Sequence, residues 1–479
     1  MEATENKQLS PLKLNVKRTM IIGFAFFGIL LLWEVYDKWC AKFLELLFME
    51  AFNKNDNEQV QYLVGIMMGL DNLAALILMP IFGRLSDKTR TKLGKRMPYI
   101  LIGTFVCAVA FPFIPVFFHY HQMVGVIITM AIVVCFAMMY RNPAVALMPD
   151  LTPKPLRSKA NGIINIMGYL GGACAAVAGV FFALTTYLGD DNANWFGRTA
   201  NIWTIELPFL IASVLMLISA IVLVLTVREN ELEAKLADEI AEGERQAAVV
   251  DSVEHDDEKP MSKANLVMLL LILVAEFFWF MSDNGITTFM INYSTNYLYT
   301  ESGPVLGMTI VGGVGSVLGF ALGGFIAQKI GRKWTIVSGL VISLVSLVLW
   351  YIFQSVFVPV KPASGYNTFP WYLFLVWGVK GFGMSLVHLN SFPMVVELCS
   401  KKKVGQFTGY YYASSMAAQT ITPTLVGLLL LSEGISWSFL PIYAIVATSI
   451  SLIIFCFVKN VKTSKTKIKT GLEAIGDED

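Results

Sequence analysis

Twelve long apolar stretches, separated by short polar breaks, constrain this chain more than any other feature. A helix needs about 20 mostly apolar residues to cross the hydrocarbon core of a bilayer. The stretches lie at roughly 20–48, 59–82, 98–118, 123–148, 160–188, 203–227, 264–298, 303–329, 334–358, 370–397, 407–431 and 436–458. Hydrophobic residues make up 56% of the 479 residues and charged residues only 15%, unlike a soluble domain. We therefore expect an all-α membrane protein, with the lipid bilayer as its partner.

Positive charges gather in alternate polar breaks. One set of breaks contains Arg84, Lys88, Arg90, Lys92, Lys95, Arg96, Lys154, Arg157, Lys159, Lys329, Arg332, Lys333, Lys401, Lys402 and Lys403. The opposite set contains only Lys54, Arg198 and Lys361. Because positively charged loops stay in the cytoplasm, we expect both termini and the long central break there. The N-terminus lacks a cleavable signal pattern, so the first helix should remain as an anchor in the cell membrane.

The sequence contains no pattern typical of a cofactor, a metal site or an enzyme. Its six cysteines show no CxxC spacing and its four histidines are scattered, which disfavours disulfide and zinc sites. Glycine runs at 168–172 and 312–324 indicate close helix packing. They are not phosphate-binding loops, because no Gly-Lys-Ser/Thr follows them. No nucleophile and base occur at plausible spacing. We expect no catalytic residue, no cofactor, no metal and no nucleic-acid partner.

The longest polar break divides the stretches six and six. It runs from Arg228 to Lys263, acidic and helix-prone at first (ENELEAKLADEIAEGERQ) and polar afterwards. The expected organisation is a cytoplasmic tail at 1–18, a six-helix bundle at 19–227, a cytoplasmic linker at 228–263, a second six-helix bundle at 264–459 and a cytoplasmic tail at 460–479.

Two segments recur in the two halves. The segment GRLSDKTRTKLGKR from Gly83 shares its first glycine and its final Gly-basic-basic with GFIAQKIGRK from Gly324. RNPAVALMPD ends on Asp150, and HLNSFPMVVE ends on Glu397. When the two are registered on these acids, Arg141 corresponds to His388. Parallel repeats of this kind are typical of carriers whose halves are related by an axis along the membrane normal.

These segments resemble the major facilitator superfamily. GRLSDKTRTKLGKRMPYIL resembles its cytoplasmic motif in the variant of the glycoside-pentoside-hexuronide cation symporters. The segments at 140–162, 388–399 and 405–427 are similar to the branch that includes plant sucrose carriers. The resemblance spans all twelve stretches. It implies a major facilitator fold with 12 transmembrane helices in two pseudo-symmetric six-helix bundles.

The motif after the second stretch is a candidate conformational latch. Its residues are Gly83, Asp87, Arg90, Gly94, Arg96, Asp150 and Arg157. Asp87 lies among cations and helix ends that can pair with it, and such contacts would hold the two bundles in one orientation and release them in the other. A solvated basic loop would explain the cations, but not the spaced glycines and Asp87. Gln328 replaces the aspartate in the second half, where we expect a weaker latch.

Few charges lie inside the apolar stretches, and each costs at least ~2.5 kcal/mol on insertion scales. Asp71 stands about 12 residues, or about 18 Å, from either end of its stretch. We interpret it as a cation-coupling residue that faces a central cavity; the alternative is a structural hydrogen bond with Asn72 or Arg141.

Arg141 is the basic counterpart of Asp71 within the apolar stretches. Its planar fork of donors could bind substrate hydroxyls or neutralise Asp71, or it could be purely structural. In the sucrose-carrier branch an arginine at this place has a substrate or coupling role, which the resemblance carries to Arg141. The paired cation-site aspartates of melibiose carriers would fall at Ala75 and Met79, so we expect a coupling proton in preference to sodium.

The first and seventh stretches carry acids and aromatics on one face of each helix. The candidate substrate-binding residues there are Trp33, Glu34, Asp37, Glu276, Trp279 and Asp283. The indole rings could stack on a sugar ring while the acids accept its hydroxyls. Alternatively, Asp37 and Lys38 form a wetted pair at the outer mouth and the tryptophans lie at the interface.

Three uncharged polar residues complete the candidate binding site: His388, Asn390 and Gln419, each shortly before a proline. A lone histidine can equally be a packing residue. Lys380 is expected to extend its ammonium group towards the outer surface.

These features predict a monomeric secondary active transporter that couples a proton to symport of a sugar or glycoside by alternating access. An exporter of a drug-like or other small solute with the same fold is the alternative, although it predicts a more apolar cavity. A sensor would need a folded soluble module, and the linker of about 36 residues is too short for one. A channel is disfavoured by the two-fold repeat.

Overall fold

The computed structural model describes residues 12–189, 201–253, 263–398 and 404–459. It contains twelve helical spans long and apolar enough to cross a membrane, which confirms the predicted all-α fold class with two six-helix bundles. Most of the two predicted tails, the polar second part of the linker, Arg198 and Lys401–Lys403 lie outside the described residues.

The N-terminal half supplies six of these spans. They are α1 (Val16–Ala51), η1 (Asn57–Val60) with α2 (Gln61–Lys88), α3 (Met97–Ala110) with α4 (Phe113–His119), α5 (Met123–Asp150), α6 (Arg157–Phe181) with α7 (Leu184–Leu188), and α8 (Trp203–Thr226). The third span bends between α3 and α4 at Pro112, which has no amide hydrogen to continue the helical ladder. The predicted boundaries agree with these spans to within a few residues.

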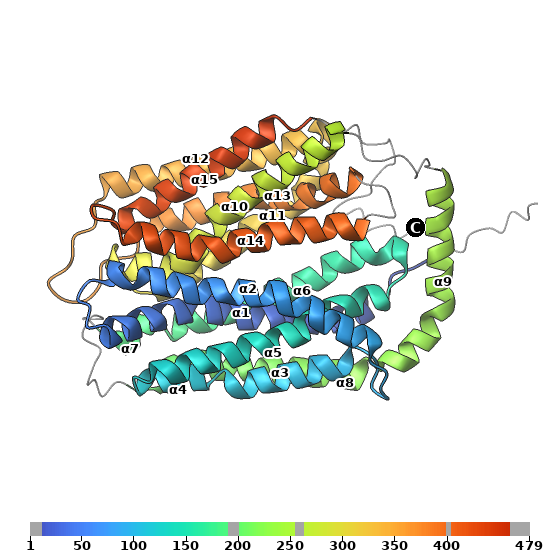
Figure 1. Cartoon of the computed structure of the whole chain (residues 1–479), viewed down its shortest axis with the longest axis horizontal. Coiled ribbons are helices and arrows are strands. Elements are labelled where there is room, and N and C mark those ends of the chain that lie inside the picture. Colours follow the sequence, from blue (N-terminus) through green and yellow to red (C-terminus); the bar gives the residue numbers. More distant parts are fainter. Residues whose placement is uncertain (1–11, 190–200, 254–262, 399–403, 460–479) are drawn as a thin grey trace, which may run out of the picture.

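The C-terminal half supplies the other six. They are α10 (Lys263–Asn296), α11 (Gly303–Ile330), α12 (Arg332–Val356), α13 (Trp371–Glu397), α14 (Val404–Leu430), and η5 (Trp437–Phe439) with α15 (Leu440–Cys456). Between the halves, the acidic start of the linker forms the helix α9 (Glu229–Val253), as its composition predicted. Figure 1 shows α9 standing across one end of the bundles. We call this the linker end and the opposite one the distal end.

Glycines let helices of the same half approach closely. A Cβ atom added to Gly315 of α11 would lie 2.0 Å from the carbonyl oxygen of Gly378 on α13, and one added to Gly171 of α6 would lie 2.2 Å from the carbonyl oxygen of Phe27 on α1. Such backbone contact replaces the hydrophobic driving force that is missing in lipid. The predicted packing role of both glycine runs is confirmed at these positions.

The two halves meet mainly along α2 and α14. A Cβ atom on Gly65 would lie 2.1 Å from the carbonyl oxygen of Pro423, and the amide of Asn72 donates to the carbonyl oxygen of Gln419 at 3.4 Å. Further hydrogen bonds between the halves join α1 to α10. Among the residues that the structure describes, the bonds between the halves lie from the middle of the helices to the distal end. The distal end is therefore the closed one.

Candidate functional site

Charged and polar side chains from five helices gather halfway along the bundles. We call this set the central cluster. Its members are Tyr36, Asp37, Lys38, Asp71, Arg141, Asp283, Lys380 and His388. Asp283 has a 38% exposed side chain although it lies in the middle of α10. A charged residue at that depth must face water or protein rather than lipid, so the cluster faces the space between the halves.

Asp71 is held by α1. The hydroxyl of Tyr36 donates to the Asp71 carboxylate at 2.7 Å, and Asp37, one residue further along α1, interacts electrostatically with both Asp71 and Arg141. The expected alternative partners, Asn72 and Arg141, were wrong: the hydroxyl of Tyr36 bonds to Asp71, while the amide of Asn72 donates to a backbone carbonyl of α14. Asp71 keeps one carboxylate oxygen outside this bond, where a proton or a donor group can bind.

Asp283 is paired with Lys380 across α10 and α13. The two form an ion pair, and His388 and Lys38 also interact electrostatically with Asp283. The prediction that Lys380 extends to the outer surface was wrong, because its ammonium is buried against this carboxylate. Lys38 is only 5% exposed and points at the carbonyl oxygen of Thr287 on α10 at 3.5 Å. The alternative of a wetted Asp37–Lys38 pair at the outer mouth therefore does not hold for Lys38.

The acid and base positions of the central cluster follow the internal repeat. Asp37 on α1 interacts electrostatically with Arg141 on α5, and Asp283 on α10 interacts in the same way with His388 on α13. The acids are separated by 246 residues and the bases by 247. Each half thus carries an acid and a base on equivalent helices, which matches the alignment of Arg141 with His388 expected from the sequence.

Removing Lys380 alone should destabilise the protein more than removing both members of its ion pair. In Lys380→Ala, Asp283 keeps a charge at membrane depth without its partner, a change that costs ~2–3 kcal/mol when the acid is partly exposed. In Lys380→Ala/Asp283→Asn no charge is left over. Thermal unfolding of purified protein should therefore show a lower midpoint for the single variant than for the double variant, with exposed Lys361→Ala as the control. Equal midpoints would contradict the pairing.

The aromatic and acidic faces of α1 and α10 contain unsatisfied polar atoms. Among the residues that the structure describes, the indole nitrogens of Trp33 and Trp279, one oxygen of Glu34 and both oxygens of Glu276 have no hydrogen-bond partner. Trp33 is half-buried and packs edge-on against Tyr36. Trp279 is 1% exposed and packs near Phe455 on α15, so its ring is covered in this conformation.

The remaining predicted binding residues lie on α13 and α14 and bond to their own helices. The amide of Asn390 donates to the carbonyl oxygen of Leu386 at 2.9 Å, and that of Gln419 donates to the carbonyl oxygen of Ser415 at 3.3 Å. Gln419 contributes instead through its backbone, which meets α2. These two side chains are not brought into the central cluster.

The candidate latch residues converge at the linker end. The guanidinium group of Arg96 contacts Asp87 at 2.5 Å and Asp150 at 2.9 Å, which ties the ends of α2 and α5 to the start of α3. Arg90 donates to the carbonyl oxygen of Asp87, and Arg157 donates to that of Pro149. Gly83 lies against the Asn142 amide. These contacts join residues of the N-terminal half to one another.

Glu229, the first residue of α9, belongs to the same network. Its carboxylate accepts from the backbone amides of Arg96 and Met97 at 3.0–3.1 Å and so caps the N-terminus of α3, where free amides and the helix dipole favour an anion. Gly94 has φ +116°, and an added Cβ atom would lie 2.1 Å from the Glu229 carboxylate. The acidic composition of the linker did not distinguish Glu229 from the other acids there. Its position just after the sixth span was the one feature of the sequence that could have pointed to it.

Replacing Glu229 by alanine should loosen the start of α9. The amides of Arg96 and Met97 would lose their acceptor, at a cost of ~1–2 kcal/mol typical of a helix cap. Burial raises the pKa of Glu229, against the opposing effect of these backbone hydrogen bonds. Glu229 therefore binds a proton more tightly in the folded protein than in the unfolded chain. The stability that this residue contributes falls as pH rises from the ordinary carboxyl pKa (~4.3) through the raised pKa.

Hydrogen–deuterium exchange over 91–98 and 229–245 would test this. Exchange should be faster in Glu229→Ala than in the unmodified chain, and its pH dependence, after correction for intrinsic exchange, should flatten. Exposed Glu231→Ala is the control. Unchanged protection in Glu229→Ala would show that the cap does not hold α9.

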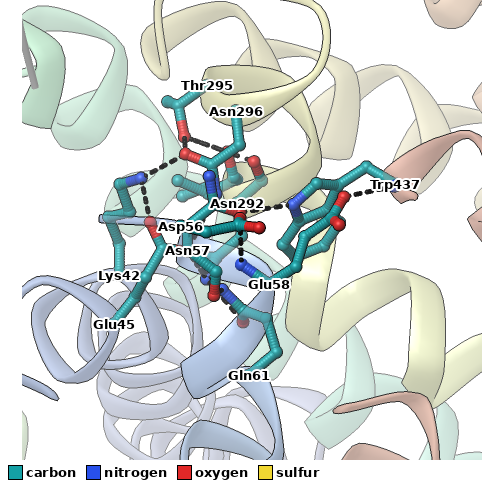
Figure 2. Close-up of polar contacts among 11 residues, drawn as sticks. Lys42, Glu45, Asp56, Asn57, Glu58, Gln61, Asn292, Thr295, Asn296 and Trp437 are labelled. Carbon is teal, nitrogen blue, oxygen red and sulfur yellow. Dashed lines mark hydrogen bonds and ion pairs between the residues drawn. The ribbon is translucent and has the colours of Figure 1, made fainter. Parts of the chain in front are cut away.

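A second polar cluster closes the distal end, and Figure 2 shows its contacts. We call it the distal cluster. It consists of Lys42, Glu45, Gln61, Asn292 and Asn296. One Glu45 oxygen contacts Lys42, and the other accepts from Gln61 at 2.7 Å, Asn292 at 2.7 Å and Asn296 at 2.9 Å. Lys42 also donates to Asn296 at 2.7 Å.

The distal cluster joins the two halves, and all its members except the half-buried Asn296 are buried. Lys42 and Gln61 are 0% exposed and Glu45 is 1% exposed. Close by, the indole of Trp437 donates to Asn57 at 2.7 Å and its backbone amide donates to Glu58 at 3.2 Å. These residues were not predicted from the sequence; the available signal was Lys42 and Glu45, three residues apart inside an apolar stretch.

Sequence comparison decides the family. The family model described as the Major Facilitator Superfamily matches residues 43–324 and 302–475. The chain belongs to the major facilitator superfamily. None of the curated proteins matches it at the significance required.

Solved structures of membrane transporters share the fold at low identity. The inward-open xylose transporter XylE from E. coli superposes with a TM-score of 0.65 at 14% identity, over 94% of this chain and 98% of that one. A peptide transporter POT in complex with alafosfalin has a TM-score of 0.62 at 13% identity, over 92% and 93%. The nucleoside transporter NupG has a TM-score of 0.60 at 12% identity, over 93% and 100%. This major facilitator is thus a multi-pass membrane transporter of small molecules, and its relatives in structure differ in cargo.

Proposed function

We propose that this major facilitator is a secondary active transporter that couples a proton to the symport of a sugar or glycoside. The observation that carries the proposal is the central cluster, in which Asp71 stands at membrane depth, bonded to the Tyr36 hydroxyl and in no ion pair with the described residues. A buried acid of this kind can exchange a proton as its surroundings change. The acids and donors around it match the hydroxyl groups of a polyhydroxylated solute.

The proposed binding residues fall into two groups. Trp33, Glu34, Asp37 and Arg141 come from the N-terminal half, and Asp283 and His388 come from the C-terminal half. Arg141 would donate to ring hydroxyls with its planar fork, and the carboxylates would accept from them. Glu276, Trp279, Asn390 and Gln419 are buried or bonded to their own helices here, so they would take part only after a rearrangement.

Alternating access follows from the two ends of the molecule. We place the linker end in the cytoplasm of a monomer in the cell membrane, because the positive charges gather there. The distal end then faces outwards, and the structure corresponds to a carrier closed to the outside. The Asp87, Arg96 and Asp150 contacts would form the latch that keeps the linker end of the N-terminal half rigid while the halves rock.

Uptake by reconstituted vesicles tests the cargo and the coupling. Radiolabelled sucrose, maltose and related glycosides are offered under an imposed proton gradient, an imposed sodium gradient or none. We expect accumulation of at least one glycoside under the proton gradient only. Accumulation under sodium alone would refute proton coupling, and an absence of accumulation under both gradients would refute sugar symport.

A further inference from the structure

Three lysines lie close together at the linker end of the C-terminal half. Lys329 is in the last turn of α11 and Lys333 is in the first turn of α12. Lys459 follows the end of α15. Lys329 and Lys459 are exposed and Lys333 is half-buried. None of the three forms an ion pair with a carboxylate of the described residues. We call these lysines and Trp334 the basic turn.

The ammonium group of Lys333 ties the basic turn together. It donates to the carbonyl oxygen of Cys456 at 2.9 Å, so the start of α12 lies beside the end of α15. It also lies 5.2 Å from the centre of the Trp334 ring, within the range of a cation–π contact. A lysine has three donors, so two remain after the bond to Cys456.

The basic turn borders an apolar surface. Trp334 is 51% exposed and lies on the same face of α12 as the exposed Val341 and Val345, because seven and eleven residues correspond to whole helical turns. Ile453 and Phe457 are likewise exposed at the end of α15. A tryptophan that ends such a surface is typical of the membrane–water interface. The basic turn therefore lies at the level where lipid headgroups meet the protein.

The internal repeat shows what the corresponding place in the N-terminal half binds. There Gly94, with φ +116°, precedes α3, and the carboxylate of Glu229 accepts from the first amides of that helix. In the C-terminal half Gly331, with φ +85°, precedes α12. Among the residues that the structure describes, the amides of Lys333 and Trp334 have no acceptor. The start of α12 thus offers donors to an anion.

The chain places a cation where the other half has its capping acid. Glu229 lies three residues after α8, and the residue three places after α15 is Lys459. Cations around a helix N-terminus oppose its dipole unless an anion lies among them. A phosphate accepts from ammonium groups and from amides at once. The sorting of positive loops explains the lysines, but it does not explain the amides or the exposed Trp334 and Phe457.

We propose that the basic turn binds an anionic phospholipid of the leaflet at the linker end. Its phosphate lies among the ammonium groups of Lys329, Lys333 and Lys459, and its acyl chains follow the exposed apolar faces of α12 and α15. The lipid phosphate takes the place at α12 that Glu229 takes at α3. The proposal depends neither on the cargo and the coupling ion nor on which side of the membrane the linker end faces.

Native mass spectrometry of the full chain, titrated in detergent with phosphatidylglycerol or phosphatidylcholine, tests the site. The unmodified chain should bind its first phosphatidylglycerol more tightly than phosphatidylcholine. In Lys329→Gln/Lys333→Gln this affinity should fall by about 30-fold, since each lysine contributes about fivefold towards an anionic lipid surface.

Lys88→Gln/Lys92→Gln is the matched control, because it removes two exposed lysines from the corresponding loop of the N-terminal half. It should leave the affinity of the first phosphatidylglycerol unchanged. Equal weakening in the two double variants would reduce the lysines to a diffuse attraction and overturn the site. Equal affinity of the unmodified chain for both lipids would also overturn it.

Hydrogen–deuterium exchange of the unmodified chain gives a second measurement that needs no variant. The amides of Lys333 and Trp334 should exchange more slowly in nanodiscs that contain phosphatidylglycerol than in nanodiscs of phosphatidylcholine alone. The amides of Arg96 and Met97, which Glu229 already caps, should exchange equally in both. Equal exchange at Lys333 and Trp334 would overturn the proposal, and the same slowing by inorganic phosphate alone would overturn the lipid as the ligand.

Discussion

Gradient-driven accumulation of the cargo should be abolished in Asp71→Asn, while the protein still inserts and folds. The asparagine amide keeps the size of the side chain and can still accept from the Tyr36 hydroxyl, but it cannot take up or release a proton. Binding of the cargo and its exchange across vesicles without a gradient should persist, because these need no net proton movement. Accumulation should fall to the level set by equilibration, a loss of the whole concentrative component.

Two further variants make this test specific to the carboxyl group. Tyr36→Phe removes the hydroxyl that donates to Asp71 and should shift the pH dependence of accumulation without abolishing it. Asp238→Asn alters an exposed acid on α9 and should leave accumulation unchanged. Concentrative uptake of normal size in Asp71→Asn would remove this residue from the coupling mechanism.

Replacing Glu45 by alanine should open the distal end. Glu45 accepts from Lys42, Gln61, Asn292 and Asn296, so its loss leaves the Lys42 ammonium buried without a counter-charge. Removal of one partner of a buried ion pair costs ~3 kcal/mol or more. Water relieves this cost when the halves separate at the distal end. The ratio of closed to open molecules should therefore fall by ~100-fold, since 1.4 kcal/mol corresponds to a factor of ten.

Distances between spin labels can measure this shift. Lys54 and Glu433 are exposed and lie in distal loops of opposite halves, so cysteines placed there report the separation of the two bundles. We expect a longer distance population in Glu45→Ala that is minor in the unmodified chain. Glu50→Ala, which removes an exposed acid whose carboxylate contacts His121, is the matched control. Identical distance distributions in both variants would show that the distal cluster does not hold the closure.

The sequence predicted the spans and the depth of the main charges well. Each span is decided by local hydrophobicity, because a bilayer penalises every exposed polar group along about 20 residues. Asp71, Arg141 and Asp283 stood out for the same reason, and the structure places all three in the central cluster. The repeat added the correspondence between Arg141 and His388.

The partners of these charges could not be read from spacing. Lys380 and Asp283 lie 97 residues apart, and Glu45 and Asn292 lie 247 residues apart. Such pairs depend on how helices rotate and tilt against one another, which hydropathy does not encode. A helix of uniformly apolar composition gives little information on which face meets which neighbour.

The paired charges of the two halves have an electrical consequence. In the N-terminal half, Lys38 and Arg141 balance Glu34 and Asp37; in the C-terminal half, Lys380 balances Asp283. With a proton on Asp71 the N-terminal half is then neutral at membrane depth. Each proton lost adds one negative charge, on which a membrane voltage acts with ~2.3 kcal/mol per 100 mV for complete transfer. The voltage would thus act mainly on the return of the unloaded carrier, whereas the loaded carrier would move no net charge across the membrane.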